Sequence, residues 1–228
     1  MTTQTVFKLP VFGDIYTGEH EYSQAALIAR IGYQHQSARN TLSRSPSIEI
    51  GSFGSSVLYT APAANLDWAH TTANNNLVRA EANYRNYRYR QRAFASQDGP
   101  LTDLSLTAFF VASPSWTFFG GPDFVAKDTP AAIDAKRQWS GRLGVSKAFG
   151  KTASLLLIGS YRHRDNRAYS ELLEAKRGDD QHNATAIAPL PALKCAGLTP
   201  EIVVQHTRLE SKHRLALFLP AHGGEREA

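Results

Sequence analysis

Cysteine is almost absent from this sequence, because Cys195 is the single one among 228 residues. One cysteine cannot form an internal disulfide, and structural zinc sites draw most of their ligands from cysteine. The 8 histidines are scattered, and none has a partner at the i, i+4 helical spacing of a metalloprotease. The sequence therefore predicts no metal site and no cofactor, and Cys195 is interpreted as a small apolar side chain.

Long apolar runs are also missing. The most apolar stretch, SLTAFFVASPSWTFFGG, is interrupted by Pro114 and two serines, whereas a transmembrane helix needs about 18 apolar residues. A helical membrane protein is excluded, but a membrane β-barrel is not, because its strands alternate and have average hydropathy. The amino-terminal stretch MTTQTVFKLPVFGDIY has neither the basic start nor the apolar centre of a signal peptide. This predicts either a cytosolic protein or a processed or truncated piece.

No catalytic constellation is visible. No serine lies in a nucleophile-elbow pattern, and the Gly-rich GSFGSS at 51–56 is not followed by Gly-Lys-Ser/Thr. Gly51 and Gly54 are better interpreted as a bulge or a hairpin turn. The carboxylates of RGDD at 177–180 are expected to lie in a loop, where they cap turns. The sequence therefore predicts that the chain is not an enzyme.

The net charge of +5 permits an acidic partner without requiring one. The stretch NYRNYRYRQR at 83–92 mixes tyrosine with arginine, as a stacking platform for single-stranded nucleic acid would. Such a platform needs its rings on one face, but Tyr84 has the opposite parity to Tyr87 and Tyr89. We interpret the stretch as a strand that leaves an apolar layer at Tyr84, and we expect no nucleic-acid partner.

What the sequence does contain is alternation of apolar and polar residues with period two, the pattern of β-strands. It recurs in LIARIGYQHQ, NLVRAEANYR and WSGRLGVSKAF, and more weakly in TPEIVVQHTR. Helical patterns are limited to a turn or two in DTPAAIDAKRQW and AYSELLEAKRGDD. On the order of ten strands are expected at roughly 10 residues each.

The connections between these segments differ in length. FGKT, SPSW and TTANNN are short, whereas RQRAFASQDGP, KDTPAAIDAKR and DNRAYSELLEAKRGDDQHN are expected to form long polar loops. Short turns at one end and long loops at the other are typical of an up-and-down barrel in an outer membrane. The prediction is an all-β, antiparallel transmembrane β-barrel that occupies residues 1–228 as one domain. Residues 1–22 are expected to be an irregular lead-in and 213–228 an atypical tail.

The two parities predict two environments. In a membrane barrel the apolar face meets lipid and the polar face lines the lumen. The lumen candidates are Arg30, Arg79, Glu81, Arg85 and Arg142. The lipid-facing candidates are Val78, Ala80, Ala82, Leu143 and Val145. Aromatic residues where apolar stretches end are expected at the membrane interfaces, namely Tyr33, Tyr84, Trp116, Trp139 and Tyr161.

The last third of the chain resembles a known family. WSGRLGVSKAFGKTASLLLIGSYRHRDNRAY is followed by RGDDQHNATAI and GLTPEIVVQHTRLESKH. These stretches resemble the carboxy-terminal barrel of the surface lipoprotein assembly modifiers, in Gly144 to Phe149, Tyr161 to Arg164, Arg177 to Asp180 and Gly197 to Ser211. The earlier strands fit the same meander more loosely.

The resemblance implies a bacterial outer-membrane location, contact with outer-membrane lipids, surface lipoprotein clients and a monomeric barrel. It also implies a signal peptide and a repeat domain ahead of the barrel. Neither precedes the barrel in this sequence, and HRLALFLPAHGGEREA replaces the usual aromatic-ended last strand. We therefore expect a truncated or frameshifted copy.

Two alternatives stay open. One is a passive porin-like channel in which Arg30, Arg79, Arg85 and Arg142 favour anions. The other is a soluble antiparallel β-sandwich or ligand-binding module, which would stay monodisperse without detergent. The membrane barrel would instead be found in a membrane fraction and change its gel mobility on heating.

Overall fold

The computed structural model describes residues 2–14, 23–150, 153–170, 175–191 and 200–211. A single 3₁₀ helix, η2, lies in this part of the chain, and no helix there is long and apolar enough to cross a membrane. The helix spans Arg92–Gln97. The strands are β1 (Thr2–Lys8), β2 (Val11–Asp14), β3 (Gln24–Gln36), β4 (Asn40–Phe53), β5 (Ser56–Thr71), β6 (Leu77–Tyr89), β7 (Gly99–Ser113), β8 (Trp116–Lys127), β9 (Lys136–Phe149), β10 (Ala153–Ser170), β11 (Ala175–Pro189) and β12 (Glu201–Ser211).

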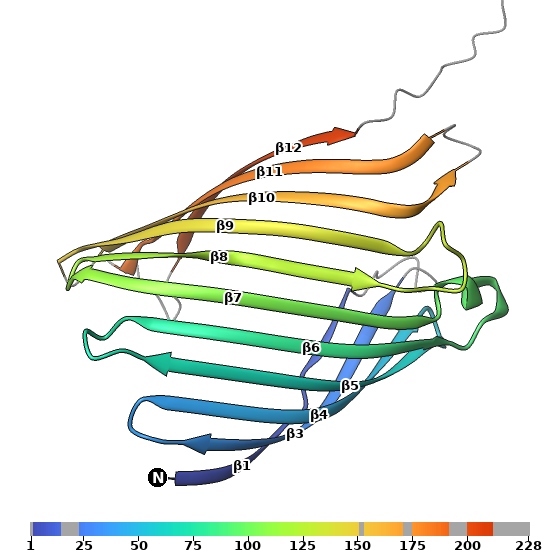
Figure 1. Cartoon of the computed structure of the whole chain (residues 1–228), viewed down its shortest axis with the longest axis horizontal. Helices are drawn as coiled ribbons and strands as arrows, with labels where there is room; N and C mark the ends of the chain where they lie inside the picture. The colour runs from blue at the N-terminus through green and yellow to red at the C-terminus, as the bar shows by residue number, and fades with distance from the viewer. Residues whose placement is uncertain (1, 15–22, 151–152, 171–174, 192–199, 212–228) are drawn as a thin grey trace, which may run out of the picture.

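All of these strands belong to one 12-stranded sheet in which β3 to β12 follow one another in chain order, while β1 and β2 both pair with β3. Every pairing is antiparallel. The sheet curls strongly, so that parts of β3 to β5 pass behind the strands in front (Figure 1). The barrel is not closed, because β1 with β2 forms one edge of the described sheet and β12 forms the other. The all-β, up-and-down antiparallel architecture is confirmed.

The strands form where the alternation predicts them. LIARIGYQHQ falls in β3, NLVRAEANYR apart from its first residue in β6, and WSGRLGVSKAF in β9. Gly54 has a φ of 58° in the turn between β4 and β5, a left-handed conformation that glycine adopts without the penalty of a Cβ. The register shifts at Gly51 and Ser52, as expected for a bulge.

The two ends of the sheet differ. At the turn end (left in Figure 1) the connections 37–39, 72–76 and 114–115 are short. At the loop end (right in Figure 1) the connections 90–98 and 128–135 are longer, and the first contains η2. Three connections depart from this asymmetry, since 54–55 and 171–174 are short but lie at the loop end, and the longer connection 190–200 lies at the turn end.

Several expectations are wrong in detail. The lead-in over 1–22 is not irregular where it is described. β1 pairs with the second half of β3 and β2 pairs with its first residues, so that together they form one edge of the sheet. The Thr and Val residues of the lead-in suit an extended backbone, and the pairing partner is too distant in sequence to be seen locally. DNRAYSELLEAKRGDDQHN is not one long loop, since β10 runs to Ser170 and β11 begins at Ala175.

The short helix expected in DTPAAIDAKRQW does not form among residues 128–135, where Asp134 makes a turn hydrogen bond to Ala131. The described part of AYSELLEAKRGDD is likewise strand. Because each of these segments is flanked by long paired strands, sheet pairing overrides a weak helical preference. The tail 213–228 and Cys195 lie outside the described residues.

A conventional core is missing from the part of the chain that the structure describes. Its buried hydrophobic residues are only Ala61 and Ala135, and no large side chain is fully buried. A soluble sandwich would bury one face of each sheet against a second sheet. The single sheet therefore contradicts the sandwich alternative.

Candidate functional site

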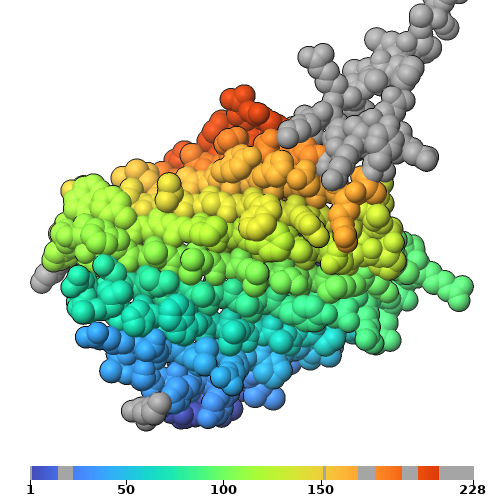
Figure 2. All heavy atoms as spheres, in the orientation of Figure 1, coloured from blue at the N-terminus to red at the C-terminus, as the bar shows by residue number. Residues whose placement is uncertain are grey.

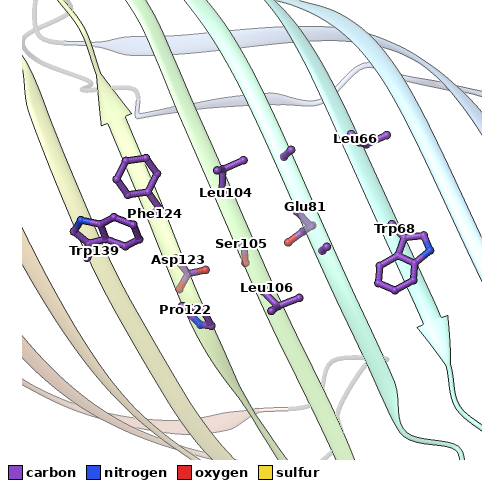
Figure 3. Close-up of a pocket in the computed structure, with 12 residues that line it drawn as sticks. Leu66, Trp68, Glu81, Leu104, Ser105, Leu106, Pro122, Asp123, Phe124 and Trp139 are labelled. Carbon is purple, nitrogen blue, oxygen red and sulfur yellow. The ribbon is translucent and has the colours of Figure 1, made fainter.

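The convex face of the sheet is apolar and uncovered. Leu143 is 75% exposed and Ile31 57% exposed, unusual values for large aliphatic side chains in a water-soluble protein. Figure 2 shows this convex side as a continuous surface from the blue strands through green and yellow to orange. In Figure 3 the far wall of the curled sheet lies behind Trp68, Leu104 and Leu106, which occupy the near side of their strands. We call this side the outer face.

A shallow groove of about 420 Å³ crosses the outer face over β5 to β9. It forms because the small side chains of Ala80 and Ala82 on β6 are flanked by larger ones on the neighbouring strands. Its outer-face lining consists of Leu66, Trp68, Ala80, Ala82, Leu104, Leu106, Pro122, Phe124 and Trp139 (Figure 3). No charged side chain of the outer face enters this set, so the groove offers hydrocarbon contacts.

The apolar band runs obliquely across the strands. One register row begins at Tyr33 on β3 and continues through Arg44, Leu66, Ala82, Leu104, Phe124 and Trp139. Tyr33 ends the apolar stretch of β3 on its turn-end side, whereas Trp139 ends that of β9 on its loop-end side. In a barrel the strands tilt by roughly 35–45° from the barrel axis. A row of directly paired residues then runs obliquely to a band of constant height, as it does here.

All of the predicted interfacial aromatics lie on the outer face. Tyr84, Trp139 and Tyr161 lie toward the loop end, and Tyr33 and Trp116 toward the turn end. Their placement at membrane interfaces stays a prediction. The Lys147 ammonium lies 4.0 Å from the ring centroid of Trp116, which brings a charge to the turn-end limit of the band.

Sequence reasoning did not select Trp68 and Phe124, which occupy comparable positions on β5 and β8. Trp68 stacks on His70, and Phe124 lies 4.3 Å from Trp139 between ring centroids. Each lies an even number of residues from outer-face apolar residues of its own strand, and this alternation in the sequence was enough to predict that it lies on the apolar face.

The concave face, which we call the inner face, is polar. It carries the five lumen candidates, although their contact with a lumen stays a prediction. Arg79 forms ion pairs with Asp67 and with Glu81, the latter at 2.7 Å. Arg85 lies 3.9 Å from Glu49. These ion pairs join β4, β5 and β6.

The other two candidates extend the same face. The Arg142 guanidinium donates to Thr107 at 2.8 Å and lies 3.8 Å from Asp123. Arg30 donates to the Asn65 side-chain oxygen at 3.5 Å. Arg79, Arg85 and Arg142 are thus balanced by carboxylates, which removes most of the anion preference expected from them.

Amides and hydroxyls complete the inner face. Asn65 donates to Ser47 at 3.1 Å, and the Gln181 amide donates to Asn183 at 2.9 Å. Asn183 in turn donates to Ser160 at 3.3 Å. Such a wall presents hydrogen-bonding groups that can replace water for a polar solute or chain.

Toward the loop end the inner face becomes basic on β8 to β10. Lys127 and Lys136 lie directly opposite each other in the register, and Arg162 and Arg164 follow on β10. We call these four residues the basic strip. Burial lowers the pKa of Lys127. Burial and the charges of Arg164, Lys127 and Arg162 lower the pKa of Lys136.

An aromatic cluster adjoins the basic strip. Tyr59 contacts Tyr87 and Tyr89 at centroid distances of 5.1 and 5.6 Å, and its hydroxyl donates to Glu49 at 2.6 Å. The Lys127 ammonium lies 5.8 Å from the centroid of Tyr87. Two tyrosines of the 83–92 stretch therefore pack inward at the loop end and are not arrayed on an exposed platform.

An acidic and histidine-containing cluster lies on the outer face of β10 and β11, beyond Tyr161. His163 Nδ1 lies 2.6 Å from an Asp180 oxygen, and His163 Nε2 lies 3.0 Å from Asp165. Among the described residues no group of three or more His, Cys, Asp or Glu is placed to hold a metal ion.

Comparisons with known proteins identify sequences similar to this chain. The sequence profile of a family described as surface lipoprotein assembly modifier matches residues 2–218. The chain is 27% identical over 201 residues to the hemophilin secretion modulator of Acinetobacter baumannii, an alignment that covers 88% of this chain and 40% of that protein. The chain thus spans less than half the length of that relative. No solved structure matches it.

Proposed function

Because the chain belongs to the surface lipoprotein assembly modifier family, we propose that its curled sheet is part of an outer-membrane β-barrel that delivers proteins to the bacterial surface. Its clients are lipoproteins or other secreted proteins that the barrel passes to the outer side. The single observation that carries the proposal is the division of one sheet into an uncovered apolar outer face and a hydrogen-bonded polar inner face.

The outer face contacts the hydrocarbon of outer-membrane lipids. In lipid every backbone polar group must be paired internally, and an antiparallel sheet achieves this once it is closed into a barrel. The exposed side chains Leu143, Ile31 and Phe110 then lie in a solvent that suits them. The aromatic residues at both limits of the band lie at the two membrane–water interfaces and fix the position of the sheet along the membrane normal.

The inner face provides a polar surface for the client. A polypeptide that crosses a hydrocarbon layer loses water from its backbone amides, and groups such as Asn65, Asn183 and Thr107 offer replacement hydrogen bonds. This role requires no bond chemistry, so we assign the chain no catalytic residue. We propose a monomeric barrel, since the outer face matches lipid and needs no partner subunit.

Surface delivery of a client tests the proposal. The chain is co-expressed with an epitope-tagged lipoprotein client in a Gram-negative host, and the tag is labelled with antibody on intact cells. Surface labelling should require the chain and should fall when Ala80→Arg blocks insertion. Equal labelling with and without the chain, while total client is unchanged, would refute the proposed role.

A further inference from the structure

The basic strip (Lys127, Lys136, Arg162 and Arg164) stands out from the rest of the inner face. Elsewhere on that face Arg79, Arg85 and Arg142 have carboxylate partners within 4 Å, and Arg30 donates to the Asn65 side chain. Within the described residues, no ion pair joins Lys127, Lys136 or Arg162 to a carboxylate. Two lysines directly opposite each other repel and destabilise a sheet. The arrangement is costly unless an anion compensates it.

The surroundings supply little negative charge. The β9 sequence KRQWSGRLGVSKAF contains no acidic residue. Asp179 on β11 lies opposite Arg164, and Asp134, which accepts a hydrogen bond from Ser96, is the one carboxylate among the described residues whose charge acts on Lys127. Four cations therefore share the loop end of the inner face with few carboxylates.

The guanidinium groups of β10 have unused hydrogen-bonding capacity. The Nε atoms of Arg162 and Arg164 are buried and have no acceptor among the described residues. Arg162 also donates to Gln181, and Arg164 to Gln138, each over a long 3.4 Å. Neutral amides at that distance hold the guanidinium groups weakly, so a carboxylate can displace them.

The spacing of the basic strip indicates the shape of its ligand. Arg162 and Arg164 lie two residues apart on one face of β10, about 7 Å along the strand. Lys127 and Lys136 lie on the next two strands, so that the strip spans roughly 10 Å across the sheet. A single carboxylate or phosphate cannot contact all four groups, whereas carboxylates on alternate residues of an extended chain repeat at the same interval of about 7 Å.

Bilayer lipids contact the outer face of a barrel, so their headgroups do not explain a strip on the inner face. We propose that the basic strip binds acidic segments of an extended client polypeptide, with Asp or Glu on alternate residues, as they pass the loop end of the inner face. This inference rests on the proposed function, because it needs a polypeptide at the inner face. In this role the basic strip recognises negative charges spaced along the client polypeptide.

Peptide binding tests the inference directly. The probe is a fluorescent peptide of alternating glutamate and serine, measured by fluorescence anisotropy against the protein in zwitterionic detergent micelles. Its control is the same peptide with glutamine in place of glutamate. The wild type should bind the acidic peptide, bind the amide peptide much more weakly, and lose affinity as salt is raised.

Two triple variants distinguish binding by the basic strip from a general effect of the protein's net charge. Lys127→Gln, Lys136→Gln and Arg162→Gln together should weaken acidic-peptide binding by about tenfold or more. The matched control, Arg88→Gln, Arg90→Gln and Arg137→Gln, removes the same charge from exposed residues near the loop end and should change binding by less than about twofold. Equal losses in the two triples, or equal binding of the two peptides, would overturn the inference.

Two single substitutions at Arg162 test the inference even if the triple variant of the basic strip does not fold. Arg162→Lys keeps the charge and should retain most of the binding, whereas Arg162→Gln should lose part of it, and equal affinities would overturn the inference. The surface-labelling assay keeps the two proposals distinguishable. A protein that binds the acidic peptide through the strip but delivers no client refutes only the transport role. A protein that delivers its client yet does not discriminate between the peptides refutes only the strip.

Discussion

Placing an arginine on the outer face should block membrane insertion. Ala80 lies between Trp68 and Leu106 in the register and lines the apolar groove. An arginine near the bilayer midplane on the lipid face of a barrel costs about 2–4 kcal/mol. At about 1.4 kcal/mol per tenfold, Ala80→Arg should lower the ratio of folded to unfolded protein by roughly 30-fold to several hundred-fold.

Ser105→Arg is the matched control because it adds the same side chain on the inner face. Ser105 lies directly opposite Glu81 and Asp123, so that two carboxylates can accept the new guanidinium. Exposed or water-facing ion pairs contribute about 0–1 kcal/mol, and we expect a change of that size in either direction. Arg79→Ala, which breaks the pairs with Asp67 and Glu81, should also cost about 1 kcal/mol or less.

The assay is the fraction of protein in the membrane pellet that shows heat-modifiable gel mobility, followed by its urea midpoint after refolding into vesicles. Ala80→Arg should reduce both, and Ser105→Arg should reduce neither. If the two arginine variants insert equally well, or if Ser105→Arg is the more damaging, the assignment of the outer face to lipid is refuted.

One further prediction concerns the packing between strands. A Cβ on Gly121 would lie 1.8 Å from the Leu106 carbonyl oxygen, whereas one on Gly141 would meet nothing within 4 Å. Gly121→Ala should accordingly cost about 1–3 kcal/mol and Gly141→Ala should be near neutral in the same urea titration, and equal midpoints would contradict the strand packing.

Local alternation was sufficient to predict much of the fold. Arg79 and Ala80 have opposite parity in the sequence, and the structure places them on opposite faces of β6. Because side chains of a strand alternate strictly, any segment with a clear period of two reveals its faces before its partners are known. The same reasoning could have selected Trp68 and Phe124.

Pairing between distant segments was not accessible in this way. β1 joins β3 through contacts such as Thr2 with Gln36, which no local pattern in residues 1–22 announces. The balance of charge depends on pairing as well. Arg79 is neutralised by Asp67 on β5, whereas Lys127 faces Lys136 on β9, and this difference appears only when the register is known. The sequence therefore identified arginines of the inner face but missed the basic strip.

The account depends most directly on what touches the even-numbered residues of β6. Single nitroxide labels at positions 78 to 85, in a Cys195→Ser background, can be probed in vesicles by collision with oxygen, which concentrates in hydrocarbon, and with a water-soluble nickel chelate. The account predicts strict alternation, with oxygen collisions dominant at Val78, Ala80 and Ala82 and nickel collisions dominant at the residues between them. Nickel access at both parities, or no alternation at all, would contradict it.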